Sequence, residues 1–335
     1  MAQGNWWQRV SAWRALAQWG FFLWVVYLGV NFGLFVRHFE SGGAAPLVSR
    51  PPGVEGFLPI GALVSLKHWL ASGTINPVHP AALVIFLAIV GMSLLAKKSF
   101  CSWLCPVGTL SEAAWKLGRR LMGRNFRPWP WLDVTLRAAK YLLLFFFVKI
   151  ILLDMPAYAL AAFLNTPYWA LSDVKMLHFF TRMSTTTMAV LAVLTLFSLI
   201  YANFWCRYLC PYGALLGLAS LLSPFKIRRD PEGCTGCRSC SRACPAGMPV
   251  HGKQTIRSPE CSGCLTCVDS CPQKGVLAME LGGGRLGLPA WVFPAAAVAL
   301  FAVGVGAGMA SGHWQSSLGY AQYRMLIPMA FMFSH

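Results

Sequence analysis

Five apolar stretches set the first limit on what this 335-residue chain can fold into. They cover residues 15–36, 80–95, 137–155, 186–204 and 288–310. A hydrocarbon core about 30 Å thick is crossed by roughly 20 helical residues, so each stretch is long enough, or nearly so, to span a bilayer. Backbone polar groups in lipid must be satisfied internally, and a helix achieves this alone. The pattern therefore predicts an α-helical integral membrane protein with about five transmembrane helices.

The composition agrees with a membrane protein. Hydrophobic residues make up 56% of the chain and charged residues only 12%, whereas soluble domains carry about 25% charged residues. The net charge of +17 would suit nucleic acid if the basic residues shared one exposed face. They flank the apolar stretches instead, so we expect the membrane to be a partner and nucleic acid not to be one.

The distribution of Lys and Arg predicts the orientation of the chain. Of the 28 basic residues, 21 lie in the N-terminal segment, residues 97–140 and residues 206–285, and 7 lie in the alternate connections. Basic residues accumulate on the cytoplasmic side of bacterial membranes. We therefore expect a multi-pass protein of the bacterial inner membrane with its N-terminus and every cysteine on the cytoplasmic side. The C-terminus, His335, is expected in the periplasm.

Eight cysteines form two runs of the pattern C-x2-C-x2-C-x3-C-P. In two-cluster ferredoxins, the fourth Cys of each run ligates the other cluster. One [4Fe–4S] cluster is therefore predicted on Cys234, Cys237, Cys240 and Cys271. The second is predicted on Cys261, Cys264, Cys267 and Cys244. A zinc ribbon also uses C-x2-C pairs, but zinc takes four ligands and has no use for the third Cys of each triplet.

These runs define the expected domain organisation. Residues 1–225 are predicted to form a membrane domain with four transmembrane helices. Residues 226–282 are predicted to form an inserted α+β bacterial two-[4Fe–4S] ferredoxin-like domain. Residues 283–335 would add a fifth transmembrane helix and an outer tail.

A second cysteine pattern, C-x3-C-P, follows two of the apolar stretches. The segments match as a repeat of aromatic, Cys, three residues, Cys, Pro, one residue and Gly. The four cysteines are Cys101, Cys105, Cys206 and Cys210. A spacing of i and i+4 predicts both thiols of a pair on one helix face, with Pro ending the helix. Four converging thiols suit a further iron–sulfur or metal centre. A dithiol redox or docking role, or inert packing of buried cysteines, remains open.

From about residue 55 to 280, the chain resembles the membrane polyferredoxin family, because it has both C-x3-C-P motifs followed by the double ferredoxin run. That family includes the quinol-oxidising subunit of periplasmic nitrate reductase systems and the C-terminal half of the nitrous-oxide reductase maturation and electron-donor protein. The resemblance implies electron transfer between quinol and other redox proteins. The chain lacks a sequence for covalent flavin and a C-x-x-C-H haem motif, so neither route is expected.

Three functions are compatible with these features. The first is an electron-transfer component that links the quinone pool to a protein redox partner, and it could be the quinol-oxidising subunit of an oxidoreductase system. The second is an electron-donating maturation or metal-reducing factor for a periplasmic metalloenzyme, which a copper site formed by outer His and Met residues would favour. The third is a cluster-based redox sensor.

Overall fold

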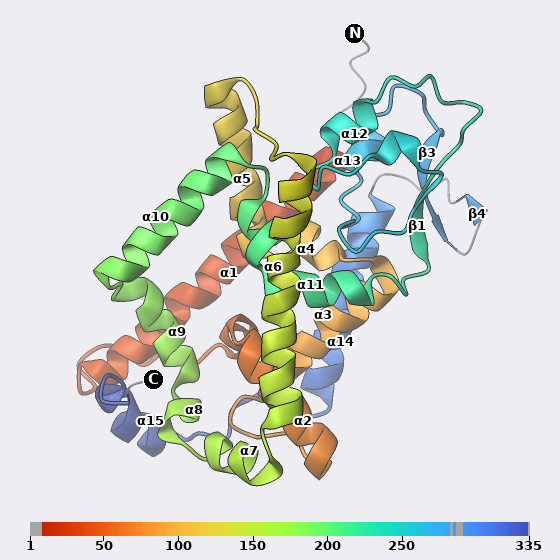
Figure 1. Cartoon of the computed structure of the whole chain (residues 1–335). Coiled ribbons are helices and arrows are strands. Elements are labelled where there is room, and N and C mark those ends of the chain that lie inside the picture. Colours follow the sequence, from red (N-terminus) through yellow and green to blue (C-terminus); the bar gives the residue numbers. More distant parts are fainter. Residues whose placement is uncertain (1–8, 282–283, 286–290, 334–335) are drawn as a thin grey trace. The chain divides into compact units, whose positions relative to one another are not determined.

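The computed structural model describes residues 9–281, 284–285 and 291–333, and most of them are helical (Figure 1). The chain divides into two compact units, which we call the first and second unit. The first unit consists of Met1–Phe22, Ile89–Leu144 and Val193–Ala302, and it contains all twelve cysteines. The second unit consists of Leu23–Ala88, Phe145–Ala192 and Val303–His335.

Two described helices are long and apolar enough to cross a membrane, α1 (Val10–Glu40) and α14 (Val292–Ala310). Two bent pairs raise the number to four if each pair forms one span: α6 (Pro130–Val148) with α7 (Ala157–Leu164), and α9 (Ser172–Thr181) with α10 (Thr185–Ile200). The stretch at 80–95 forms α3 (Pro80–Ala96), a shorter apolar helix. The described residues thus hold two to four candidate spans, and the start of the predicted fifth stretch, 288–290, lies outside them.

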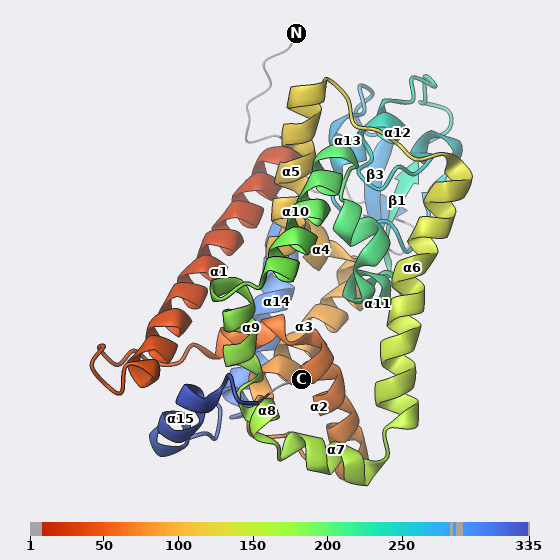
Figure 2. The same cartoon turned by 60° about the vertical axis from the view of Figure 1, so that its left-hand side comes forward.

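A four-stranded antiparallel sheet lies in the first unit, with the order β2-β1-β3-β4. Strand β1 (Phe225–Arg229) pairs with β2 (Thr255–Ile256) on one side and with β3 (Leu277–Leu281) on the other, and β4 (Gly284–Arg285) pairs with β3 at the edge of the sheet. Ile227 of β1 is buried and lies opposite Ile256 and Met279. The short helices α12 (Ser239–Ala243) and α13 (Thr266–Asp269) lie next to each other in both views (Figures 1 and 2).

The C-x3-C-P segments do not form the single helices expected from their spacing. The first consists of α4 (Ser99–Trp103) and α5 (Pro106–Met122), separated by an extended Cys105. The second consists of a π-helical turn (Trp205–Leu209) and α11 (Pro211–Ala219), separated by an extended Cys210. A helix ends before each Pro, as expected, but the second Cys of each pair lies outside that helix. Pro begins the next helix, because its fixed φ suits the first helical position and its missing N–H is not needed there.

The second unit is built around two buried apolar clusters. One joins α1 to α9 and to α15 (Tyr320–Leu326) through aromatic and aliphatic side chains that include Phe35, Phe39, Val174 and Tyr323. The other joins α2 (Pro59–Ser72), α7 and α8 (Pro167–Ala170) around the fully buried Trp169. Between the end of α1 and α2, the chain contains a short 3₁₀ helix at Pro52–Phe57.

Candidate functional site

Two cavities in the first unit are each lined by four cysteines. One cavity is lined by Cys261, Cys264, Cys267 and Cys244. The other is lined by Cys234, Cys237, Cys240 and Cys271. Each set therefore combines three cysteines of one run with the fourth cysteine of the other run. This is the crossed grouping that the spacing predicts for two-cluster ferredoxins.

The two loops that carry the triplets have matching local geometry. Gly236 and Gly263 adopt left-handed backbone angles, with φ of 70° and 64°. Their amides donate to Cys234 and Cys261, each two residues earlier in the sequence. Arg238 and Leu265 are also left-handed and immediately precede α12 and α13. A loop of this shape turns its cysteines and amides toward one point, which suits a cluster ligated by thiolates and hydrogen-bonded through its sulfurs.

The cavities therefore fit [4Fe–4S] clusters in donor type, donor number and amide supply. Among residues 9–281, 284–285 and 291–333, no group of three or more His, Cys, Asp or Glu side chains is arranged to hold a single metal ion.

The two cysteine sets differ in exposure. Cys237 is exposed and Cys234 is partly exposed, whereas Cys261, Cys267 and Cys244 are buried. Amide hydrogen bonds lower the pKa of Cys234 and Cys237. Burial raises the pKa of Cys244 to about 11. We call the two predicted cluster sites the exposed site and the buried site.

The first C-x3-C-P segment holds the loop of the buried site through hydrogen bonds, and α1 adds one more. Trp103 Nε1 donates to the Gly263 carbonyl at 3.2 Å, and Ser102 Oγ donates to the Ser262 carbonyl at 2.7 Å. Arg14 of α1 donates from Nη1 to the Cys264 carbonyl at 3.1 Å. Trp103 is completely buried. The loop that carries Cys261 and Cys264 is therefore attached directly to the segment that carries Cys101 and Cys105.

Buried lysines surround the same loop. Lys97 is 1% exposed, and its Nζ donates to the Ile256 carbonyl at 3.1 Å. Burial lowers the pKa of Lys97, and the neighbouring Cys261 acts in the opposite direction. Lys140 is fully buried and pairs with Glu260 Oε2 at 2.6 Å, next to Cys261 in sequence. The sequence alone gives these lysines only a role in orienting the chain in the membrane. One feature of the sequence does indicate a further role for Lys97, namely its position just before the first C-x3-C-P motif.

The four C-x3-C-P cysteines come together in the first unit from two separate segments. Burial raises the pKa of Cys206 well above its ordinary value, and the charges of Cys210, Cys105 and Cys101 raise it further. Burial likewise raises the pKa of Cys105 to about 11, while the amides of Gly108 and Val107 oppose the shift.

Helix N-termini supply amides to this group. Gly213 N donates to Cys210 Sγ at 3.2 Å at the start of α11. At the start of α5, a Cβ on Gly108 would lie 2.4 Å from the Cys101 carbonyl oxygen, so this position requires glycine. Amide donors at a helix N-terminus stabilise thiolates. The two segments therefore share a local geometry in which the second Cys lies at a helix start and accepts from its amides.

The outer histidines are engaged with protein groups. His38 bonds the Ala45 carbonyl and Tyr320, and His79 bonds Glu55 and the Trp169 carbonyl. His68 bonds the Thr74 carbonyl, and His178 bonds Glu40. His335 lies outside the described residues.

Comparison with known proteins matches these sites to iron–sulfur families. The family described as a 4Fe-4S binding domain matches residues 78–125 and 183–230, so each copy contains one C-x3-C-P motif. The family described as a 4Fe-4S dicluster domain matches residues 226–272, which contain both ferredoxin runs. No solved structure matches the chain.

Three curated relatives extend this result. YccM of Escherichia coli, named as a candidate electron transport protein, is 44% identical over 99% of this chain and 94% of its own length. Protein NirI of Paracoccus denitrificans is 31% identical over 61% of this chain and 30% of its own length. The ferredoxin-type protein NapH of Haemophilus influenzae is 27% identical over 75% of this chain and 82% of its own length.

A chain with apolar membrane helices, two cysteine-lined cluster cavities and these relatives is a membrane iron–sulfur protein with an electron-transfer role. It binds [4Fe–4S] clusters and works with redox partners, as ferredoxin-type proteins do. The chain belongs to the membrane polyferredoxin family, together with YccM, NirI and NapH.

Proposed function

We propose that this protein passes electrons between the quinone pool and a protein redox partner through three thiolate-held centres. Two are the [4Fe–4S] clusters of the exposed and buried sites, with the crossed ligation given above. The third is an iron–sulfur or metal centre on Cys101, Cys105, Cys206 and Cys210. The clusters supply one-electron redox chemistry when bound, and the chain's own residues position them and control their access to solvent.

The single observation that carries this proposal is the attachment of the buried-site loop to the C-x3-C-P segment. Trp103 and Ser102, which lie between Cys101 and Cys105, bond the carbonyls of Gly263 and Ser262, which lie between Cys261 and Cys264. A rigid contact between two cysteine groups keeps their centres at a constant separation, as stepwise electron transfer requires. The exposed site then offers the surface at which a soluble partner could exchange electrons.

The proposed topology has five spans in the inner membrane, with the ferredoxin-like domain at residues 226–282 on the cytoplasmic side and the C-terminus outside. A core about 30 Å thick separates the two sides. The ferredoxin clusters alone therefore cannot serve partners on both faces. A centre at the helix ends, together with a mobile quinone, supplies the connection.

The test is quinol-dependent cluster reduction in the purified, lipid-reconstituted protein, followed by electron paramagnetic resonance. Cys101→Ser and Cys206→Ser should each abolish reduction by quinol while dithionite still reduces both ferredoxin clusters. Ser111→Ala is a matched control, because Ser111 is buried on α5 and is not a thiol. Full quinol-dependent reduction in the quadruple Ser variant would refute the role of the third centre.

A further inference from the structure

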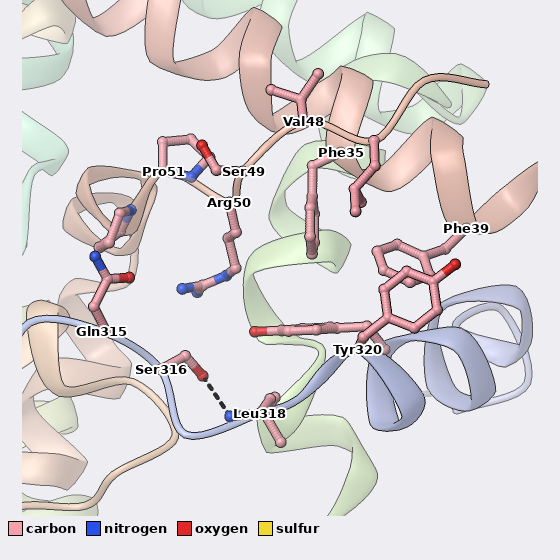
Figure 3. A pocket seen from close by; sticks show the side chains of 13 residues that line it. Phe35, Phe39, Val48, Ser49, Arg50, Pro51, Gln315, Ser316, Leu318 and Tyr320 are labelled. Atoms are coloured by element: carbon pink, nitrogen blue, oxygen red, sulfur yellow. Dashed lines mark hydrogen bonds between the residues drawn. The ribbon is translucent and has the colours of Figure 1, made fainter. Parts of the chain in front are cut away.

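A large pocket lies in the second unit, which contains none of the twelve cysteines. Its volume is about 600 Å³, within the range of small-molecule sites. It is lined by the end of α1, by residues 47–52 and by residues 315–323. Figure 3 shows Phe35 and Phe39 on one side, Arg50 extending inward, and Gln315, Ser316 and Leu318 on the opposite side.

Aromatic rings form much of the wall. Phe35 and Tyr323 make an edge-to-face pair with centroids 5.1 Å apart, and Phe39 lies 5.0 Å from Tyr320. Tyr320 is 49% exposed, and its hydroxyl bonds His38 Nε2 at 3.0 Å. Rings held in this way present faces and edges to a flat ligand, with which they can form offset-stacked or edge-to-face contacts.

Arg50 brings a positive charge to the pocket, and the carboxylates of Glu55 and Asp173 already balance that charge. Arg50 Nε donates to Asp173 Oδ2 at 3.0 Å, and Nη2 donates to Glu55 Oε1 at 2.7 Å. None of the hydrogen bonds among the described residues uses Arg50 Nη1. Both carboxylates are nearly or fully buried. An anionic ligand would have to compete with them for the guanidinium, so the site favours an uncharged ligand that accepts a hydrogen bond.

A buried acid–base pair lies behind Arg50. Glu55 is fully buried, accepts from the Ala82 amide at 3.0 Å, and contacts His79 Nδ1 at 3.2 Å. Burial would lower the pKa of His79, but the hydrogen bond to Glu55 and the charge of Asp173 outweigh it and raise this pKa. A protonated His79 brings the group of one Arg, one His and two carboxylates to neutrality.

We propose that this pocket binds the headgroup of a quinone or quinol, with the ring among Phe35, Phe39 and Tyr320. One ring oxygen accepts a hydrogen bond from Arg50, and the tail leaves past the exposed Leu47. A quinone is flat, which suits the aromatic walls, and uncharged, which suits the balanced charge of Arg50. Its ring oxygens can accept the hydrogen bond that Arg50 donates. The inference rests on the proposed function, because that function makes the quinone pool a partner.

The test measures binding of decylubiquinone to the full chain in lipid nanodiscs. Ser49→Trp should fill the pocket and weaken binding at least tenfold. Ala44→Trp, in the same connecting segment but outside the pocket lining, should bind as the wild type does. Tyr320→Phe should weaken binding a few-fold, because the ring loses the hydrogen bond to His38 that holds it in place. Arg50→Met is unsuitable, because it would leave Glu55 and Asp173 buried without their cation. Unchanged affinity in Ser49→Trp would overturn the assignment.

A second measurement separates this inference from the proposed function. Decylubiquinol is added to the wild type and to Ser49→Trp, and cluster reduction is followed by absorbance. Slower reduction in Ser49→Trp supports the pocket. Equal rates in both proteins, together with unchanged binding of decylubiquinone, overturn the pocket and leave the proposed function intact. Loss of binding in Ser49→Trp, without any reduction of wild-type clusters by quinol, supports the pocket as a binding site and refutes quinol as the electron donor.

Discussion

Trp103 donates its indole N–H to the Gly263 carbonyl at 3.2 Å, and this bond joins two segments 160 residues apart in sequence. Each segment lies between two cysteines. The indole is completely buried, so the bond is protected from water and the two cysteine groups are held as one body. Loss of the bond would leave a buried carbonyl unpaired, at a cost of about 1–3 kcal/mol.

Trp103→Phe should therefore slow electron exchange between the buried site and the C-x3-C-P centre while leaving the metal content unchanged. An aromatic ring remains in place of the indole, so much of the packing is kept while the N–H is lost. Freeze-quench spectroscopy after rapid quinol addition would follow the two centres separately. Equal rates in the variant and the wild type would show that the contact has no part in electron transfer.

Crossed ligation makes opposite predictions for two cysteines. Cys271→Ala should destroy the exposed cluster, although Cys271 belongs to the second run, and leave a cluster that reacts slowly with an iron chelator. Cys244→Ala should destroy the buried cluster and leave one that reacts quickly. The wild type should hold about eight iron atoms in these two clusters, plus any metal of the third centre. Chelator kinetics in the reverse order would support ligation within each run.

Lys97→Met should lower the reduction potential of the buried cluster. A buried cation stabilises the more negative, reduced form, and its loss should cost on the order of 1–3 kcal/mol. Lys274→Met is the control, because Lys274 is exposed near Cys271 and is screened by solvent. Redox titration of both variants measures the change in potential. A change of equal size for Lys274→Met would mean that burial of the charge is irrelevant.

The pH dependence of stability should reveal the contribution that protonated His79 makes to folding. Its pKa is raised in the folded protein, so its contribution is fully present below its unfolded pKa of about 6.5 and is lost as pH rises through the folded pKa. A tenfold difference in proton affinity between the folded and unfolded states corresponds to about 1.4 kcal/mol of stability. Thermal unfolding in nanodiscs between pH 6 and 9 should show this loss in the wild type, and His79→Gln should remove it.

Reporter fusions test the proposed orientation. Alkaline phosphatase is active only outside the cytoplasm, so a fusion after Asp230 should be inactive and a fusion after His335 active. The basic-residue distribution is the reason for this expectation. The reverse pattern of activities would invert the topology.

The sequence patterns predicted which cysteines belong together, but they did not predict the local backbone structure around those cysteines. The grouping of Cys244 with the second triplet follows from a pattern shared by two-cluster ferredoxins. The break between Cys101 and Cys105 was missed, because the i and i+4 spacing was interpreted as a continuous helix although Pro106 also suits the start of a new one. The Arg50 network was also missed. Its partner Asp173 lies 123 residues away, and no periodicity in the sequence connects the two.

The backbone at Lys97 has a consequence for the stability of the first unit. Its φ of 59° is left-handed, a conformation that costs a residue with a Cβ on the order of 1 kcal/mol or more and that glycine adopts freely. Substitution by glycine would relieve this local conflict and remove the ammonium group. Lys97 therefore combines a strained backbone with a buried ammonium group, and both act against the stability of the folded chain. Lys97→Gly should thus relieve the backbone strain but leave a cavity and an unpaired Ile256 carbonyl, so the protein should be less stable and its buried cluster should have a lower reduction potential.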